Sequence, residues 1–380
     1  MQTNISFWES TAFYLSYDVM IIGSGIVGLN AALHLKQQQP KLKVGVLEAG
    51  FLPSGASTKN AGFACFGSVS EILDELETTS ENEVLQVIEM RWKGLSILRE
   101  TLGDQAIEYQ QSGGYEIFKA GSSELSCAYR EKIPYLNTLL KDVIGMTDIY
   151  AVANEKIADF GLANVDSMIL NRYEAQIDTG RMMSSLLQKV TSLGVNIYNN
   201  CKLLELVNND SDFTLKTNQG NFQANKVVLA TNAFIGDFYP ELNIVPGRGQ
   251  VLVTEPIPGL KINGTFHYDQ GYYYFRNINN RILLGGGRNI DFKAEETTDS
   301  GTTAAVQTAL EDLLYNTILP GQTPAIEYCW SGVMAFGDQL KPIIKQIEPG
   351  VFCAVRCNGM GVAMGSLSGQ QVAELVIAEL

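Results

Sequence analysis

The sequence is poor in the residues on which many cofactor-free active sites depend. It contains only two histidines, His34 and His267, which excludes a histidine-rich metal site and disfavours a Ser-His-Asp hydrolase. Its six cysteines include no C-x-x-C pair, and this favours reduced thiols in a cytoplasmic protein over a disulfide framework. We therefore predict no metal, and we expect the chemistry to come from a bound cofactor.

Long apolar runs and positive charge are also scarce. No run of 18 or more apolar residues occurs, so no transmembrane helix is predicted, and residues 1–16 lack the basic start and apolar core of a signal peptide. The net charge of −14 argues against nucleic acid or an anionic membrane as the main partner. With 380 residues, 46% of them hydrophobic, the chain can build a large core, and we expect two domains.

Residues 17–48 have the order of a nucleotide-binding unit. An apolar strand at 19–22 leads into the glycine turn GSGIVG at 23–28, and a helical pattern and a second strand at 44–47 follow. Glu48 ends that strand, twenty positions after Gly28. This order of strand, turn, helix, strand and acid predicts a dinucleotide site, and by itself it leaves NAD and FAD both open.

Each residue type in this stretch has a physical reason. Gly23 permits the tight turn, Gly25 lets a pyrophosphate approach the backbone, and Gly28 lets the helix lie close to the strand. The helix N-terminus offers N–H groups to the phosphates. Glu48 can accept hydrogen bonds from a ribose diol and would repel a 2′-phosphate, which disfavours NADP.

The rest of the chain predicts an α/β fold whose two domains are interleaved. Strands typical of a nucleotide domain recur at 18–48, 195–231 and 351–379, and 244–290 has the pattern of a mostly antiparallel sheet. Within it Tyr272 and Tyr274 would share one face of a strand. We also expect helical structure at 71–103, a hairpin at 107–119 around Gly113-Gly114, and helices at 122–140, 178–193, 304–316 and from the end of the turn at 356–361 to Ala378.

Several ordered motifs resemble the FAD-dependent D-amino-acid oxidase superfamily, in its glycine oxidase and sarcosine oxidase branch. The motifs cover nearly the whole length: GSGIVG with Glu48, GASTKNAG (55–62), IDTGR (177–181), VVLATNA (227–233), RGQVLVTEP (248–256), RILLGGGR (281–288), CWSGVMAFGDQLKPII (329–344) and NGMGVAMGSLSGQQVAELV (358–376). Their order favours FAD over NAD. In the family the last helix points its N-terminus at the flavin, where its dipole stabilises the anionic reduced form.

The resemblance implies a Rossmann-type, glutathione-reductase-like FAD domain at 17–75, 176–235 and 325–380, with a substrate domain at 76–175 and 236–324. It also implies which residues contact FAD: Gly23, Gly25, Ile26, Val27, Gly28, Glu48, Ala49, Ala56, Ser57, Asn60, Ala61, Gly62, Ala230, Thr231, Gly359, Met360, Gly361 and Val362. For the substrate, the candidates are Tyr272, Tyr274, Arg276 and Met334.

The implied reaction is oxidation of a C–N bond of a small amine or amino acid. A hydride passes from the substrate carbon to flavin N5, the imine hydrolyses in water, and oxygen or another acceptor reoxidises the flavin. Two alternatives share the motifs: a dehydrogenase that passes electrons to a quinone or carrier, and a non-catalytic FAD-binding subunit of a larger complex. A branch that modifies tRNA bases is disfavoured by the acidic charge.

The chain departs from the family at several positions. Met334 stands where W-x-G-x-R would place an arginine for the substrate carboxylate, and Arg248, Arg276 or Arg356 are the candidates to replace it. This tilts the expectation toward amines without a free α-carboxylate, such as acylated polyamines. Leu283 stands near the position of a lysine that activates oxygen in sarcosine-oxidase-like members.

Two further departures concern the flavin itself. The closing turn reads Gly359-Met360-Gly361 where G-H-G is common in the family. The cysteine that holds a covalent flavin in that branch has no match beyond the candidate Cys357, so covalent attachment and oligomeric state are left open.

Overall fold

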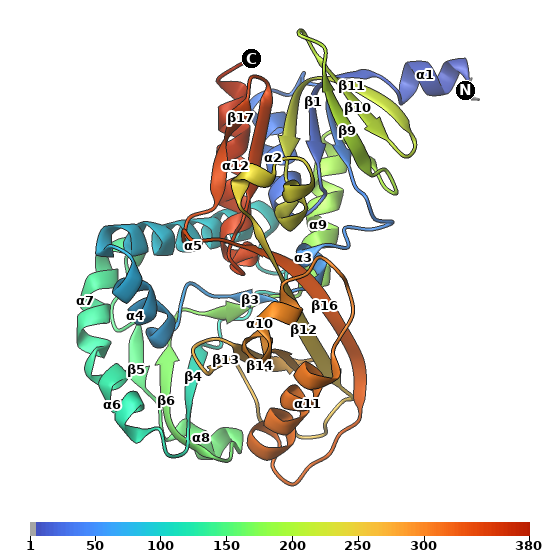
Figure 1. Cartoon of the computed structure of the whole chain (residues 1–380). Coiled ribbons are helices and arrows are strands. Elements are labelled where there is room, and N and C mark those ends of the chain that lie inside the picture. The colour runs from blue at the N-terminus through green and yellow to red at the C-terminus, as the bar shows by residue number, and fades with distance from the viewer. Residues whose placement is uncertain (1–4) are drawn as a thin grey trace. The chain divides into compact units, whose positions relative to one another are not determined.

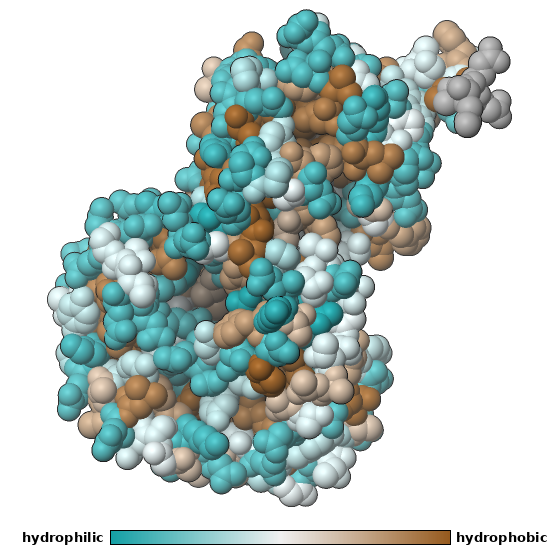
Figure 2. All heavy atoms as spheres, in the orientation of Figure 1, coloured by the Kyte–Doolittle hydropathy of each residue, from teal (hydrophilic) through white to brown (hydrophobic). Residues whose placement is uncertain are grey.

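A computed structural model describes residues 5–380, which form two compact units, each built from separate segments of the chain (Figure 1). Unit 1 contains the chain up to Thr58 together with Gly180–Val245 and Ala335–Leu380. Unit 2 contains Lys59–Thr179 and Pro246–Met334. Hydrophilic side chains make up much of the visible surface of both units (Figure 2). Among the described residues, no helix has the length and apolar character needed to cross a bilayer.

The boundaries of the two units differ from the domain boundaries that we expected from the sequence. Residues 59–75 belong to unit 2, because β3 (Phe63–Ala64) pairs with β7 (Ala175–Gln176). Residues 325–334 also belong there, because β16 (Ile326–Phe336) lies beside β12 (Val245–Thr254) in the sheet of that unit. The assignment of one domain to FAD and the other to substrate remains a prediction.

Unit 1 is built on a mostly parallel sheet, which follows from buried β-branched strands such as VGVL and KVVL. Its main order is β17 (Ile343–Glu348), β18 (Val351–Val355), β11 (Gly220–Leu229), β1 (Ser16–Ile22), β2 (Val44–Leu47) and β8 (Asn196–Tyr198). Only β17 is antiparallel in this row. The hairpin β9 (Leu203–Asn208) and β10 (Phe213–Thr217) continues antiparallel from β11.

Two helices of unit 1 cross closely beside this sheet. They are α2 (Ile26–Gln38) and α12 (Gly361–Ile377), and a Cβ at Gly369 would lie 2.5 Å from the carbonyl oxygen of Val27. Both begin at the carboxyl-end edge of the parallel strands, which fixes where their N-termini lie. The other helical segments here are α1 (Phe7–Ala12), α3 (Ala56–Lys59), α9 (Thr179–Ser192), η1 (Asn232–Asp237) and η2 (Pro240–Leu242).

Unit 2 is built on a mostly antiparallel sheet of eight strands, as the sequence predicted for 244–290. Its order is β16, β12 (Val245–Thr254), β15 (Arg281–Gly286), β14 (Tyr273–Ile278), β13 (Thr265–Tyr268), β4 (Gly114–Lys119), β6 (Val165–Asn171) and β5 (Tyr150–Val152), with β13 and β4 parallel. Phe266 and Phe275 stack at 4.5 Å within the apolar core on one face. Because side chains alternate along a strand, their neighbours His267 and Arg276 point to the opposite face.

Helices cover the apolar face and flank the sheet (Figure 1). Leu310 and Leu314 of α11 and η4 enter the same core as Phe266 and Phe275. The helical segments of unit 2 are α4 (Val69–Thr78), α5 (Glu81–Leu102), α6 (Ser123–Glu131), α7 (Ile133–Ile144), α8 (Lys156–Phe160), η3 (Arg288–Ile290), α10 (Phe292–Glu295), α11 (Ala304–Leu313) and η4 (Leu314–Ile318).

Two local predictions in this unit are wrong. The single helix at 122–140 is two helices, α6 and α7, which meet at Lys132 just before Pro134. The hairpin at 107–119 does not form, because Gln110 bridges to Gln176 and Gly114 begins β4. A Cβ at Gly114 would collide with the carboxylate of Glu174, so this glycine serves close packing and not a turn.

Candidate active site

The glycine turn of unit 1 lies at the carboxyl-end edge of its sheet. Ile22 is opposite Leu47 on one side and Leu229 on the other, so the residues that follow β1, β2 and β11 meet at one edge. Gly23 has φ of 103°, and a Cβ there would lie 2.7 Å from the carbonyl oxygen of Ala230. A Cβ at Gly28 would collide with the Gly23 carbonyl, which accounts for both glycines by geometry.

Ser57 lies at the start of α2, beside the glycine turn. The N–H of Ile26 donates to Ser57 Oγ at 2.9 Å, and a Cβ at Gly25 would lie 2.8 Å from the same oxygen. The loop after Glu48 therefore returns to the N-terminus of α2, and the predicted contact of Ser57 with FAD remains a prediction. This arrangement places a hydroxyl and a bare backbone at the end of a helix, where a phosphate is favoured.

Glu48 is held against the turn by three hydrogen bonds. Its Oε2 accepts from Ser24 N–H at 3.1 Å and from Ser24 Oγ at 2.7 Å, while Oε1 accepts from Gly50 N–H at 2.8 Å. The side chain is 9% exposed. Oε2 accepts two of these bonds and Oε1 accepts one, so Oε1 keeps a lone pair that can still accept from a diol.

The other predicted FAD contacts of unit 1 follow β11 and precede α12. Thr231 Oγ1 is buried and has no hydrogen-bond partner among the described residues. Gly359 has φ of 83°, and a Cβ at Gly361 would meet nothing within 4 Å. An unsatisfied buried hydroxyl and open space at a helix N-terminus fit a dinucleotide cofactor at this edge.

Cys357 precedes this last turn but is poorly suited to covalent attachment. Burial raises the pKa of its thiol to about 11, against a smaller opposing effect of Ser368. The nucleophilic form of cysteine is the thiolate, so this environment disfavours reaction.

The predicted FAD contacts of unit 2 are organised by Arg276. Asn60 Oδ1 accepts from Gly62 N–H and from Thr179 Oγ1, both at 2.9 Å. The Arg276 guanidinium donates to the Ala61 carbonyl at 2.5 Å and to the Ile177 carbonyl at 3.0 Å, and the residue is 3% exposed. Burial lowers the pKa of Arg276 to about 10. This arginine ties two loops together through the Ala61 and Ile177 carbonyls.

The two other arginines that the sequence singled out also have partners within the chain. Arg248 pairs with Glu295 through Nε–Oε2 at 2.7 Å and a second contact at 3.0 Å. Arg356 donates to the Lys341 carbonyl at 2.9 Å. All three arginines therefore make hydrogen bonds within the chain, although Arg356 Nε is buried without a partner among the described residues.

Tyr274 and Met334 come close to each other around Gly249, whereas Tyr272 does not join them. A Cβ at Gly249 would lie 2.9 Å from Met334 Cε and 3.9 Å from the Tyr274 hydroxyl. Strand β14 begins only at Tyr273, and Tyr272 is 37% exposed with its ring on Phe292. Burial raises the pKa of Tyr274 to about 12, so its hydroxyl stays neutral in ordinary buffers.

Sequence reasoning missed a buried polar cluster on the same face of the sheet. His267 Nε2 lies 3.1 Å from Glu174 Oε2, and Glu116 accepts hydrogen bonds from the N–H and hydroxyl of Ser70. Burial raises the pKa of Glu116 to about 7. The alternation of polar and apolar residues in TFHY was the available signal for β13, but nothing marked its partners across the sheet.

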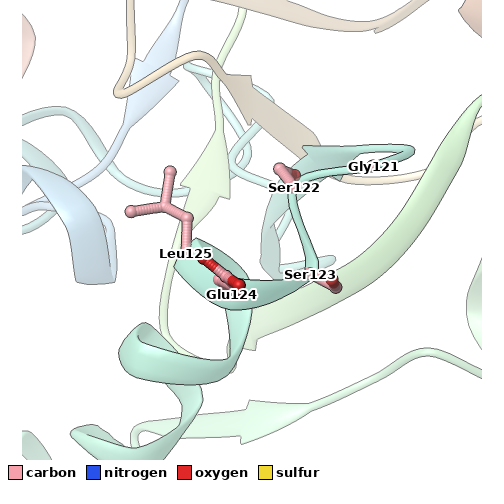
Figure 3. Close-up of a pocket in the computed structure, with 5 residues that line it drawn as sticks. All are labelled: Gly121, Ser122, Ser123, Glu124 and Leu125. Carbon is pink, nitrogen blue, oxygen red and sulfur yellow. The ribbon is translucent and has the colours of Figure 1, made fainter.

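A surface hollow near the start of α6 is not this site. It is lined by five consecutive residues, Gly121 to Leu125, and Figure 3 shows that they come from one loop and one helix start. None of the predicted cofactor or substrate residues contributes to it.

Residues 18–375 match the model of the family described as "FAD dependent oxidoreductase" (DAO). The chain belongs to this family. It is 24% identical to the gamma-glutamylputrescine oxidoreductase of Escherichia coli over 95% of this chain and 84% of that protein. It is also 24% identical to the glycine oxidase of Geobacillus kaustophilus over 95% of this chain and 93% of that protein.

The fold is similar to solved structures of the same kind. The crystal structure of the Geobacillus kaustophilus glycine oxidase superposes with a TM-score of 0.76 at 20% identity, covering 96% of this chain and 95% of that one. These findings confirm the predicted family, the Rossmann-type fold, FAD as the cofactor and an FAD-dependent oxidoreductase acting on C–N bonds of amine or amino-acid donors.

Proposed function

We propose that this member of the DAO family oxidises the C–N bond of an amine whose reacting carbon carries no free carboxylate, such as an acylated polyamine. The observation that supports the proposal is that the candidate arginines make hydrogen bonds and ion pairs within the chain. Met334 occupies the position of the carboxylate-binding arginine, and the buried Arg276 donates to two backbone carbonyls. A substrate carboxylate would need a bidentate cationic partner that these residues do not offer. The name of the Escherichia coli relative, gamma-glutamylputrescine oxidoreductase, is consistent with such a substrate.

The chain's own residues would bind and orient the reactants. In unit 1, the glycine turn, Ser57 and Glu48 would hold the pyrophosphate and ribose of FAD, which when bound supplies the acceptor for a hydride from the substrate carbon. In unit 2, Met334 would offer an apolar surface to the substrate. Tyr274 would offer a neutral hydroxyl that can donate a hydrogen bond but does not act as a base near neutral pH. The amine must therefore arrive deprotonated.

We place the reaction in the reducing cytoplasm, which is consistent with six cysteines that form no disulfide. Oxygen, a quinone or a carrier protein would accept the electrons.

The test is an anaerobic panel of substrates, with loss of the oxidised-flavin absorbance as the readout. Acylated diamines, free diamines, glycine, sarcosine and D-amino acids would be mixed with the purified holoenzyme. We expect an acylated diamine to bleach the flavin fastest. Rapid reduction by glycine, sarcosine or a D-amino acid would overturn the proposed substrate class. If no compound reduces the flavin while partner chains co-purify, the alternative of a non-catalytic FAD-binding subunit is favoured.

A further inference from the structure

The strand register of unit 2 places a cysteine and a glutamate side by side. In the short ladder between β3 and β7, Ala64 pairs with Ala175. The next positions outward are Cys65 and Glu174, which therefore face each other across the ladder. His267 of β13 reaches the same point from the sheet, with Nε2 3.1 Å from Glu174 Oε2. The sulfur, one imidazole nitrogen and one carboxylate oxygen of these residues all lie within 4.8 Å of one another.

The three side chains are buried together with an excess of negative charge. Cys65, Glu174 and His267 are 6%, 1% and 5% exposed, and Glu174 Oε1 is buried without a hydrogen-bond partner among the described residues. Two further carboxyl groups lie nearby: Glu71 Oε2 is 3.9 Å from His267 Nδ1, and Glu116 is opposite His267 in the ladder of β4 and β13. The guanidinium of Arg91 is paired with Glu75. An unpaired buried carboxylate oxygen is costly, and a cation would compensate it.

We propose that Cys65, Glu174 and His267 bind one divalent transition-metal ion of the zinc type within unit 2, a site that the sequence alone did not predict. Sulfur, imidazole nitrogen and carboxylate oxygen together match the donors that zinc prefers and do not match magnesium or calcium. Binding forms three metal–ligand bonds while the Cys65 thiol gives its proton to solvent, and His267, where it is protonated, also gives one proton to solvent and binds as the neutral imidazole.

Two neighbouring features complete this site. A cavity of about 10 Å³ adjoins Glu174 and His267 and is lined by Glu116, Asn171 and Tyr150 among others, which is room for one water as the fourth ligand. On the other side of the imidazole, Glu71 Oε2 lies 3.9 Å from Nδ1. Metal-bound histidines are commonly oriented by a carboxylate that is hydrogen-bonded to the second nitrogen. At 3.9 Å Glu71 lies beyond hydrogen-bond distance, and it contributes its charge at that side of the ring. The ion would tie β3, β7 and β13 together and would take no part in hydride transfer.

Zinc content of the holoenzyme is the direct test. The protein would be stripped with a chelator, dialysed against zinc and then against metal-free buffer, and analysed for zinc and FAD per chain. We expect one zinc per chain in the wild type and its loss in Cys65→Ser and Glu174→Gln. Cys201→Ser is the matched control, because Cys201 is an equally buried thiol in unit 1 that contacts Thr217, and it should retain the zinc. Zinc that is absent from the wild type, or retained by both site variants, would overturn the proposal.

Cobalt uptake by the wild type decides the matter if the variants do not fold. A cobalt-loaded holoenzyme should show a thiolate-to-cobalt charge-transfer band in the difference spectrum against the metal-free protein, and zinc should raise the midpoint of thermal unfolding. Bound cobalt without that band would place the ion away from Cys65 and overturn the proposal. Because metal content and flavin reduction are separate readouts, failure here leaves the proposed amine oxidation untouched.

Discussion

Single residues decide how closely a phosphate can approach the glycine turn. A side chain at Gly25 would meet Ser57 Oγ at 2.8 Å from its first carbon, and its further atoms would extend over the end of α2. We expect Gly25→Val to purify without FAD, because the branched side chain displaces both Ser57 and the pyrophosphate. The measurement is the ratio of flavin to protein absorbance after purification.

Gly236→Ala is the control for this substitution. Gly236 also belongs to unit 1, and a Cβ there would meet nothing within 4 Å. This variant should keep the wild-type flavin content. A fully yellow Gly25→Val protein would show that the pyrophosphate lies elsewhere.

The two tyrosines proposed to line the substrate should behave differently. Tyr274 lies beside Met334 and Phe63 in the sheet, whereas Tyr272 is exposed outside the strand. We expect Tyr274→Phe to slow flavin reduction by the best amine of the panel about tenfold, which corresponds to the loss of one hydrogen bond worth about 1.4 kcal/mol. In the Tyr272→Phe variant, the amine should reduce the flavin at the wild-type rate. If stopped-flow traces show that both substitutions change the rate of flavin reduction equally, Tyr274 does not line the substrate site.

Elements are joined by buried pairs whose stability depends on pH. Arg248 of β12 holds Glu295 of α10, and Gln250 donates to the same carboxylate at 2.9 Å. Burial raises the pKa of Glu295, but the hydrogen bonds from Arg248 and Gln250 outweigh it and leave that pKa below its usual value of 4.5. Because the folded pKa lies below the unfolded one, the pair stabilises the protein above about pH 4.5 and loses this contribution as the pH falls through the folded value.

Glu295→Gln should therefore lower the free energy of unfolding at neutral pH. It should also make that free energy less dependent on pH in the acid range. We expect a loss of about 3 kcal/mol at pH 7, because Arg248 keeps a buried charge without its partner. Urea unfolding at a series of pH values measures both effects. Glu89→Gln, which breaks an exposed ion pair with Lys93, should change stability by less than about 0.5 kcal/mol. An acid-unfolding curve of Glu295→Gln that is parallel to the wild type would contradict this account.

How far the sequence predicts these elements depends on whether the signal is local. The turn at Gly23, α2 and the acid at Glu48 are encoded within a short stretch, and the structure has them as expected. The hairpin predicted around Gly114 was wrong because a glycine is needed there to leave room for the Glu174 side chain. Glu174 lies sixty positions away, and no local pattern connects it to Gly114. The partners of His267 were missed for the same reason, since the ladder of β3 and β7 and the sheet bring them together only in three dimensions.

At the scale of the whole molecule, we expect the two units to have different tasks, because they contain different kinds of sheet. The parallel sheet of unit 1 gathers strand ends and helix N-termini at one edge, which suits a dinucleotide. The antiparallel sheet of unit 2 has one apolar face for its core, and this leaves the opposite face for Tyr274, Arg276, His267 and Glu116. Polar residues on that face are stabilised by one another and not by solvent, so substitutions there should affect folding and function together.

The electron acceptor is a property of the whole molecule, and here we expect oxygen to be a poor one. Leu283 stands near the position of the oxygen-activating lysine and is 4% exposed, within an apolar cluster that includes Val251 and Val253. Transfer of an electron to oxygen builds negative charge, which an apolar side chain does not stabilise.

After anaerobic reduction by substrate, the flavin should therefore reoxidise slowly in air-saturated buffer and rapidly when a soluble quinone is added, as stopped-flow absorbance would record. Leu283→Lys should accelerate the reaction with oxygen, and Leu283→Met should not, because only the lysine adds a positive charge to a side chain of similar length. Fast reoxidation of the wild-type flavin in air would mean that another group supplies the positive charge. The protein would then be an oxidase that uses oxygen as its electron acceptor.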